Sequence, residues 1–243
     1  MTFEKLDHTN LSKKVVRAIR HQIFSGVLKA DERVVESEIA RALGISRGPV
    51  REALVELERE GLIITYPRKG TYVTNFTDKD IEEIYTLRAL LEGHAVTRAL
   101  DRLEGQDLDR LKDLLNEIGE TAEKNDNIDV AQLDMQFHEE ICKLADHKRL
   151  YDTWKSLLAQ IQMLSATATE YYTNVKDVRK RHEVLVDALV KGDRGYVKEC
   201  FEQHILNSMN GLISHLKKMR GQGPLEAEGV EEQPLAKMKP DVP

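Results

Sequence analysis

The stretch Leu43–Gly61, LGISRGPVREALVELEREG, decides the fold of the first part of this 243-residue chain. Gly44 stands where a helix ends in a left-handed residue, and Ser46 stands two residues later, where the next helix needs an N-cap. The apolar residues that follow recur at three- and four-residue spacing, as on the buried face of a helix: Val50, Ala53, Leu54 and Leu57. The stretch therefore predicts a helix, a tight turn and a second helix.

The free face of the second helix suits the major groove of DNA. It carries Arg47 and Arg51, and Ser46 adds a hydroxyl at the start of the helix. Arginine can pair with guanine or with phosphate, and the N-terminus of a helix favours anions. The alternative is plain packing, because helix-turn-helix geometry and charge pairs also occur on ordinary exposed helices.

A basic hairpin follows the second helix and favours DNA recognition over plain packing. Residues 62–65 and 71–74 form two β-prone runs, joined by a turn from Pro67 to Gly70. Arg68 and Lys69 at its tip can lie along a DNA backbone, and Gly70 permits close approach. Contacts of this kind position a protein on DNA without specifying a sequence.

These residues together resemble a known family. LGISRGPVREAL, EGLI and PRKGTYV look like the winged helix-turn-helix of the GntR family of bacterial transcription regulators, over residues 10 to 75. The resemblance implies that Ser46, Arg47 and Arg51 contact DNA and that Gly70 lies at the tip of the wing. The chain departs from the family pattern at Gly48, where threonine is common, and so loses one side-chain contact.

Composition and charge predict a cytoplasmic protein of two domains. No apolar run approaches the roughly 18 residues of a membrane span, and the N-terminus lacks the apolar core of a signal peptide. The net charge is −6, yet residues 1–75 hold 13 Lys and Arg against 10 Asp and Glu. This basic surplus is modest, so we expect two copies of the chain to bind DNA together.

The fold class predicted is mainly α, with a winged helix-turn-helix before an all-α six-helix bundle. An amphipathic helix is expected over residues 11–28. The expected domains are a DNA-binding domain over 1–75, an effector-binding and dimerisation domain over 76–219, and a disordered tail over 220–243 that holds four of six prolines. Breaks in the helical pattern mark six bundle helices at 77–102, 106–123, 128–145, 148–171, 174–191 and 193–218.

Three histidines and an aspartate in the bundle indicate a divalent-metal site. Asp134 and His138 are four residues apart and share a helical face, as a ligand pair on one helix must. His182 and His204 lie beside apolar stripes of two later helices, where an unpaired imidazole is costly. Together they could hold an ion with positions left open for water or a ligand. The alternative for Asp134 and His138 is a capped or solvated pair.

This order of ligands, DxxxH on the third bundle helix and single histidines on the fifth and sixth, resembles the FCD effector domain of the FadR subfamily within GntR. Six helices rather than seven resemble the VanR-like branch. The resemblance implies a bound divalent ion, with Asp134, His138, His182 and His204 as ligands, and a small organic acid that completes the coordination. Nitrogen-rich ligation favours zinc or nickel, and manganese is also compatible.

Arg88 and the two cysteines have competing interpretations. Arg88, in YTLRALLEGHA, matches the arginine of the family's LRxxLE motif, which implies a clamp on the effector carboxylate. Its alternative is an ion pair with Glu92, four residues on. Cys142 and Cys200 each lie four residues from a histidine ligand, so a thiolate-containing zinc site competes with simple packing.

The function predicted is that of a homodimeric, sequence-specific transcription regulator and not an enzyme. Its affinity for a double-stranded operator would respond to a small organic acid, with repression relieved by that effector as the commoner outcome. One alternative is a metal-dependent enzyme that uses the same Asp/His cluster. Another keeps the DNA binding but makes the metal purely structural.

Overall fold

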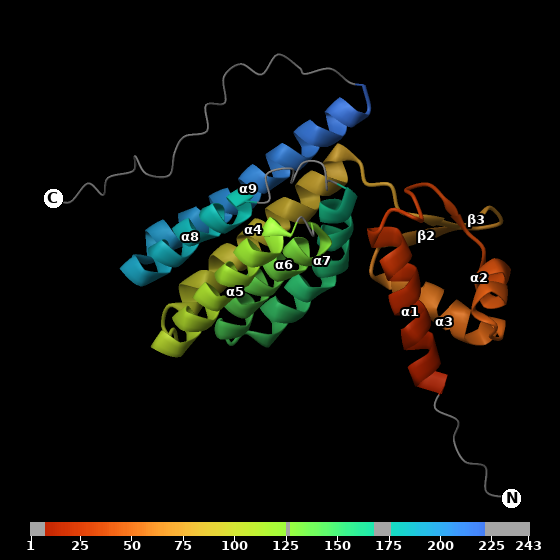
Figure 1. Ribbon diagram of the computed structural model, residues 1–243, viewed down its shortest axis with the longest axis horizontal. Helices are drawn as coiled ribbons and strands as arrows, with labels where there is room; N and C mark the ends of the chain where they lie inside the picture. The colour runs from red at the N-terminus through yellow and green to blue at the C-terminus, as the bar shows by residue number, and fades with distance from the viewer. Residues whose placement is uncertain (1–7, 125–126, 168–175, 222–243) are drawn as a thin grey trace, which may run out of the picture.

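The computed structural model describes residues 8–124, 127–167 and 176–221. Figure 1 shows a small head of helices and strands beside a larger helical bundle, joined by the chain that leads into the first bundle helix. Most of the predicted tail over 220–243 lies outside the described residues. None of the described helices has the length and apolar character needed to cross a membrane.

The head contains three helices and a three-stranded antiparallel sheet with strand order β1-β3-β2. The predicted hairpin is present, and β1 adds a third strand through Arg33 opposite Tyr72. A two-residue strand is too short to show any alternation, so the sequence pattern missed it. The elements are α1 (His8–Phe24), β1 (Arg33–Val34), α2 (Glu36–Leu43), α3 (Arg47–Arg59), β2 (Ile63–Tyr66) and β3 (Gly70–Val73).

The turn between α2 and α3 has the predicted form. Gly44 adopts φ 65°, and the amide of Ile45 bonds back to the carbonyl of Ala40 at 3.0 Å. Ser46 occupies the N-cap position of α3, although its side chain makes no capping hydrogen bond. The first helix ends at Phe24 rather than at residue 28, because Gly26 adopts φ 72° and turns the chain.

The bundle consists of six helices within the described residues, as predicted. Thr77 begins α4 through a capping box: its hydroxyl accepts from the Asp80 amide, and the Asp80 carboxylate accepts from the Thr77 amide. The predicted ends at 168–171 and 174–175 lie outside the described residues. The helices are α4 (Asp78–Ala99), α5 (Gly105–Glu123), α6 (Asn127–Leu144), α7 (Lys148–Thr167), α8 (Lys176–Lys191) and α9 (Arg194–Met219).

The head packs against α7 of the bundle. Met163 of α7 is 2% exposed and belongs to the apolar core of the head, with Ala159 packed beside it. The Gln160 side chain lies directly against Gly61, the residue that turns the chain after α3. The bundle helix α7 therefore contacts the end of the helix predicted to bind in the major groove.

Candidate metal centre and DNA-binding face

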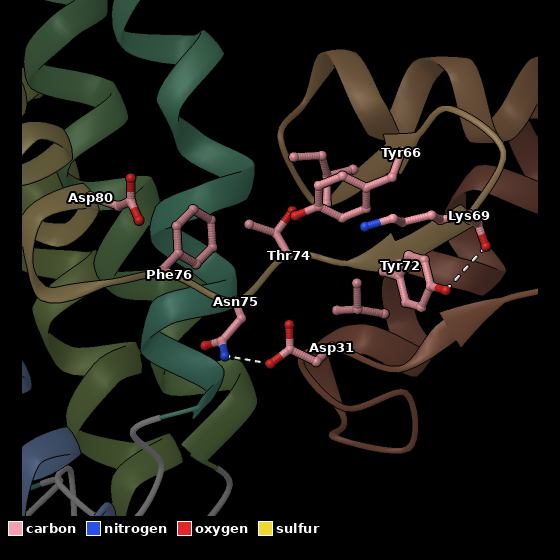
Figure 2. Close-up of a pocket in the computed structure, with 10 residues that line it drawn as sticks. Asp31, Tyr66, Lys69, Tyr72, Thr74, Asn75, Phe76 and Asp80 are labelled. Carbon is pink, nitrogen blue, oxygen red and sulfur yellow. Dashed lines mark hydrogen bonds between the residues drawn. The ribbon is translucent and has the colours of Figure 1, made fainter.

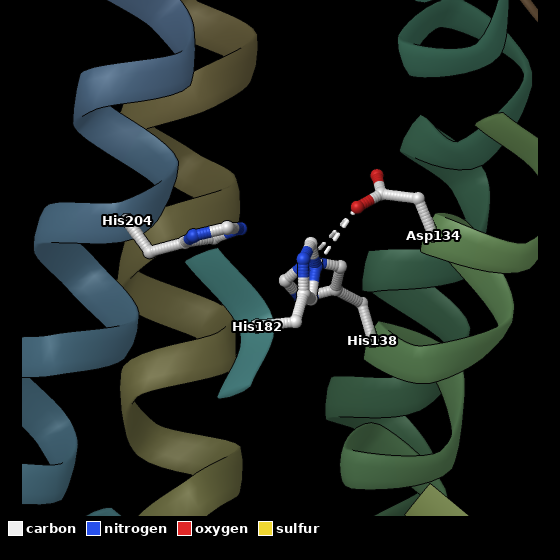
Figure 3. A group of neighbouring side chains, drawn as sticks. All are labelled: Asp134, His138, His182 and His204. Carbon is white, nitrogen blue, oxygen red and sulfur yellow. Dashed lines mark hydrogen bonds and ion pairs between the residues drawn. The ribbon is translucent and has the colours of Figure 1, made fainter. Parts of the chain in front are cut away.

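Four side chains from three helices meet inside the bundle. Asp134 and His138 come from α6, His182 from α8 and His204 from α9, and their ligand atoms all lie within 4.8 Å of one another. Figure 3 shows the three imidazoles and the carboxylate turned towards a common centre. The structure thus brings together the residues that the sequence marked as ligands.

The chemistry and spacing of this group fit one divalent ion. Bonds of about 2.0–2.2 Å place two ligand atoms of an ion roughly 3–4 Å apart. The Nε2 atoms of His138 and His182 are 3.2 Å apart, and Asp134 Oδ1 lies 2.8 Å from His182 Nε2 and 4.0 Å from His138 Nε2. Nitrogen and oxygen donors of this kind suit zinc, nickel and manganese.

The protonation states also favour metal binding. Burial lowers the pKa of His138, and burial together with the neighbouring His182 and His138 lowers the pKa of His204 well below its usual value. Burial alone would raise the pKa of Asp134, but His182, His138 and Arg88 together outweigh it and hold this pKa below its usual value. The lowered pKa values favour the neutral forms of His138 and His204 and the anion of Asp134, which are the forms that bind a cation.

Glu92 of α4 supports the site and was not found from the sequence, where it appeared only as a partner for Arg88. Its carboxylate is fully buried and lies 2.5 Å from Nδ1 of His138, the nitrogen opposite the candidate ligand atom. It also accepts from Arg88 Nε and from Trp154 Nε1, each at 2.7 Å. Burial would raise the pKa of Glu92, but Arg88 and His138 outweigh it and lower this pKa to about 2. Glu92 is therefore an anion that fixes the orientation of a candidate ligand.

Arg88 has both a partner and a free donor. Its ion pair with Glu92 is present, yet its Nη2 is buried and makes no hydrogen bond within the described residues. A small cavity beside it is lined by Asp134, His182, His204, Val178, Arg181 and Ser208. The Nε of Arg181 is also buried and has no hydrogen-bond partner in the described part of the chain. The cavity next to the metal group thus presents two arginine donors suited to an anion.

The cysteines stand apart from this group. Cys142 and Cys200 are buried and free, and burial raises the pKa of each thiol. In the described part of the chain, the group able to hold an ion contains no cysteine. Both residues contribute instead to the apolar core of the bundle.

The predicted DNA-binding residues of α3 are exposed on the head. Ser46, Arg47 and Arg51 lie at and near the N-terminus of the helix, where its amides favour anions. The Arg51 side chain is 70% exposed and forms two hydrogen bonds with Glu36 of α2, at 3.0 and 3.2 Å. An exposed ion pair contributes about 0–1 kcal/mol, so Arg51 can exchange Glu36 for DNA at small cost.

The wing carries one cation that the sequence reading overlooked. Gly70 adopts φ 118°, and a Cβ built there would lie 2.9 Å from Nε of Arg33 on the neighbouring strand. The glycine thus admits the Arg33 guanidinium beside the wing tip, where Arg68 and Lys69 are also exposed. Arg33 went unnoticed because β1 itself was not predicted.

A second cavity, of about 570 Å³, lies where the wing meets the chain leading into the bundle. Figure 2 shows Lys69 extending from the wing tip back between Tyr66 and Tyr72, with Phe76 on the bundle side. The Tyr72 hydroxyl donates to the Lys69 carbonyl at 3.1 Å. In this arrangement the Lys69 ammonium lies along the wing rather than beyond its tip.

The head and the bundle each match a known protein family. The pattern of the family described as "Bacterial regulatory proteins, gntR family" matches residues 11–73, and that of the "FCD domain" matches residues 83–207. The two matches coincide with the head and with most of the bundle. The family matches indicate a transcription regulator rather than an enzyme.

Proteins named as transcriptional repressors match most of this chain. The gluconate operon transcriptional repressor of Bacillus subtilis is 30% identical over 208 residues, which cover 82% of this chain and 84% of that protein. A probable D-xylose utilization operon transcriptional repressor of Paenarthrobacter nicotinovorans is 29% identical over 204 residues, covering 84% of this chain and 89% of that protein.

A solved structure with the same fold is McbR/YncC of Escherichia coli, with a TM-score of 0.71 and 24% identity over 83% of this chain and 96% of that one. The architecture is mainly α, a winged helix-turn-helix followed by a helical FCD domain. The chain therefore belongs to the GntR family and is a DNA-binding transcription regulator with an FCD domain.

Proposed function

We propose that this regulator binds its operator as a homodimer in the cytoplasm, and that a small carboxylate bound at a divalent metal ion in the bundle sets its operator affinity. One observation carries the proposal. The four ligand atoms of the metal group meet within 4.8 Å beside the buried, unbonded Nη2 of Arg88. A cation and an arginine donor facing one cavity are the partners that a carboxylate requires.

The ion would be held by Asp134, His138, His182 and His204. Zinc or nickel suits three imidazoles and one carboxylate best, and manganese is also compatible. When bound, the ion supplies a Lewis-acidic centre that attracts an anion. The residues themselves orient the site, since Glu92 holds His138 and the Val178 carbonyl lies 2.8 Å from Nδ1 of His182.

The effector is assigned by chemistry to small organic acids. Arg88 keeps its Nε on Glu92 at 2.7 Å, while its Nη2 remains available to a carboxylate in the cavity. Arg181, on the same wall, can add a second contact. One relative is named for a gluconate operon, and gluconate is itself a carboxylate, which supports this class.

Repression relieved by the effector is the outcome we propose. Two of the similar regulators are named as operon repressors. An effector can shift operator affinity only by its preference between two arrangements of the protein, typically about 1–3 kcal/mol. We therefore expect the carboxylate to weaken operator binding about 5- to 150-fold.

DNA recognition is assigned to α3 and the wing. Ser46, Arg47 and Arg51 would bind in the major groove, while Arg68, Lys69 and Gly70 would contact the backbone. Two copies on a two-fold operator supply the affinity that the small basic surplus of one head cannot.

A purely structural ion is the remaining alternative within this function. It predicts that chelation melts the bundle and that no small acid adds to the effect of the metal. Under our proposal, a carboxylate raises the melting temperature of the metal-loaded protein beyond the effect of the metal alone.

The test is a screen of small mono- and dicarboxylates against operator binding by the metal-loaded protein. Arg88→Lys is the informative variant, because it keeps the positive charge beside Glu92 but removes the planar fork of donors. We expect wild type to respond to at least one acid and Arg88→Lys to need a much higher concentration of it. Equal responses from both proteins would exclude Arg88 as the effector clamp.

A further inference from the structure

The Glu92 carboxylate contacts both parts of the proposed regulatory site. Oε2 of its carboxylate faces His138, the candidate metal ligand, while Oε1 accepts from Arg88, the candidate effector clamp. The third partner is Trp154, which donates from Nε1 to the same Oε1 at 2.7 Å. Any movement of Arg88 or His138 on ligand binding therefore acts on a carboxylate that α7 also holds.

This carboxylate cannot exchange its partners freely. Glu92, Trp154 and His138 are all 0% exposed, so no water replaces a donor that moves away. A buried anion left without a donor is strongly destabilised. The hydrogen-bond partners of Glu92 must therefore move together with its carboxylate. A displacement of this carboxylate accordingly also displaces Trp154.

Trp154 belongs to the helix that carries the head. It lies in the second turn of α7, and Gln160 and Met163 follow on the same helix, roughly 9 and 14 Å further along at 1.5 Å per residue. Met163 is buried in the core of the head, and Gln160 lies against Gly61 at the end of α3. A continuous helix thus links the Glu92 hydrogen bond to the base of the DNA-binding helix.

We propose that the Glu92–Trp154 hydrogen bond couples the metal and effector site to the DNA-binding head through α7. Trp154 acts as a positioning residue, since within the described residues it belongs neither to the metal group nor to the lining of the cavity beside it. The inference rests on the proposed function, which supplies the ligand. If an ion binds Nε2 of His138, the imidazole proton is on Nδ1, which faces Glu92. This proton strengthens the hydrogen bond between His138 and Glu92.

The chain offers a specific variant and a matched control. Trp154→Phe removes the indole N–H while keeping an aromatic ring in the core. Tyr151→Phe, one turn earlier on α7, removes a hydroxyl that bonds to Glu139 instead of Glu92. The two rings stack at 6.4 Å, so both changes affect the same region of packing.

The first readout is operator affinity, measured with a duplex selected by the wild-type protein from a random pool, without and with Zn²⁺. We expect zinc to change the affinity of wild type and of Tyr151→Phe by about 5-fold or more. In Trp154→Phe, zinc should bind equally well, yet the change in operator affinity should fall below 2-fold. A Trp154→Phe protein that keeps the full response to zinc would overturn the coupling.

The second readout needs no variant, because Trp154 is the single tryptophan of the chain. Zinc has no redox chemistry, and adding it should change the Trp154 emission of wild type. Adding operator to the zinc-loaded protein should change this emission again, since coupling between sites is reciprocal. If zinc binds but neither addition alters the emission, the coupling is contradicted while the metal site stands. If no zinc binds, the proposed metal site itself fails and the coupling with it.

Discussion

At the scale of single residues, the energetics of the site centre on a buried charge. Glu92 is fully buried, and its anion persists because Arg88, Trp154 and His138 surround it with donors. Burying a lone carboxylate is costly, so these contacts mainly offset the free-energy cost of removing the charged groups from water. They add little net stability. The gain is orientation, because His138 is held with one nitrogen towards the candidate ion.

Replacing Glu92 with glutamine should weaken metal binding without removing a ligand. Glu92→Gln keeps the shape of the side chain but loses the charge that orients His138, and we expect metal affinity to fall about 10- to 100-fold. Competition with a chromophoric chelator measures this. Glu139→Gln is the control, because Glu139 neighbours His138 in sequence but bonds to Tyr151 and Lys155. Equal affinities in the two variants would deny Glu92 its supporting role.

We expect the proposed DNA-binding residues to separate into specific and non-specific contacts. Arg51→Ala should abolish preference for the operator, whereas Lys69→Ala should weaken binding to all sequences and lower the salt slope by about one unit. Arg59→Ala is a matched control, since Arg59 is exposed in the last turn of the same helix. Titrations of operator and unrelated DNA at several salt concentrations distinguish these effects. Operator preference that survives in Arg51→Ala would remove α3 from the proposed contact.

Residue patterns indicated the four residues of the candidate metal group but not the residues that contact and orient them. Asp134 and His138 share a helical face, which spacing alone indicates, and the two later histidines lie beside apolar stripes. Glu92 and Arg33 gained their roles from partners on other elements, at His138 and Gly70. Such contacts depend on how separate elements pack together, and the residue pattern within one segment does not predict that packing.

At the scale of elements, helix ends decide where the chain turns. The α2–α3 turn depends on Gly44 in the left-handed region, and α4 begins at the capping box of Thr77 and Asp80. Both were predictable because each relies on residues next to one another in sequence. The short strand β1 could not be predicted in this way, because it is a strand only through its pairing with β3.

Removal of the α4 cap should cost measurable stability. Thr77→Ala loses the hydroxyl that accepts from the Asp80 amide at 3.2 Å, and we expect a loss of about 1 kcal/mol in urea unfolding. Ser46→Ala should cost clearly less, because the Ser46 side chain makes no capping bond. Equal losses would show that the hydroxyl bond is not what stabilises α4.

The same cap predicts a pH dependence. Hydrogen bonds from the Thr77 side chain and then its amide lower the pKa of Asp80. Its contribution is therefore present above the unfolded carboxyl pKa and is lost as pH falls through the lower folded pKa. The stability difference between wild type and Asp80→Asn should accordingly shrink in acid. A difference that grows as pH falls would contradict the assigned hydrogen bonds.

At the scale of the whole molecule, the head is positioned by its contact with α7. Met163 and Gln160 lie on a helix whose apolar pattern predicts a buried face but not which neighbour covers it. The six bundle helices of the described residues could be predicted from local periodicity. The contact between the head and α7 could not, because it is seen only in the structure. Through this contact, α7 connects the proposed DNA-binding helix to the proposed regulatory site.

The docking contact is testable at Gly61. Gly44 and Gly61 share left-handed backbone, so alanine at either should cost about 1–2 kcal/mol. Only at Gly61 would the new Cβ meet a neighbour, Gln160 Nε2 at 2.8 Å. A double-mutant cycle of Gly61→Ala with Gln160→Ala should therefore give a coupling of about 0.5 kcal/mol or more in urea unfolding. A cycle of Gly44→Ala with Gln160→Ala should give none, and equal values in both cycles would contradict the docking.

The proposed function depends on a bound divalent ion, and elemental analysis of protein purified without added metal tests for that ion. His182→Ala is the variant to compare, because it removes a ligand while leaving Glu92 with its three donors. We predict about one zinc, nickel or manganese ion per wild-type chain and a large loss in the variant, as a four-ligand site requires. Wild-type protein without a divalent ion, or a variant that retains it fully, would contradict the account.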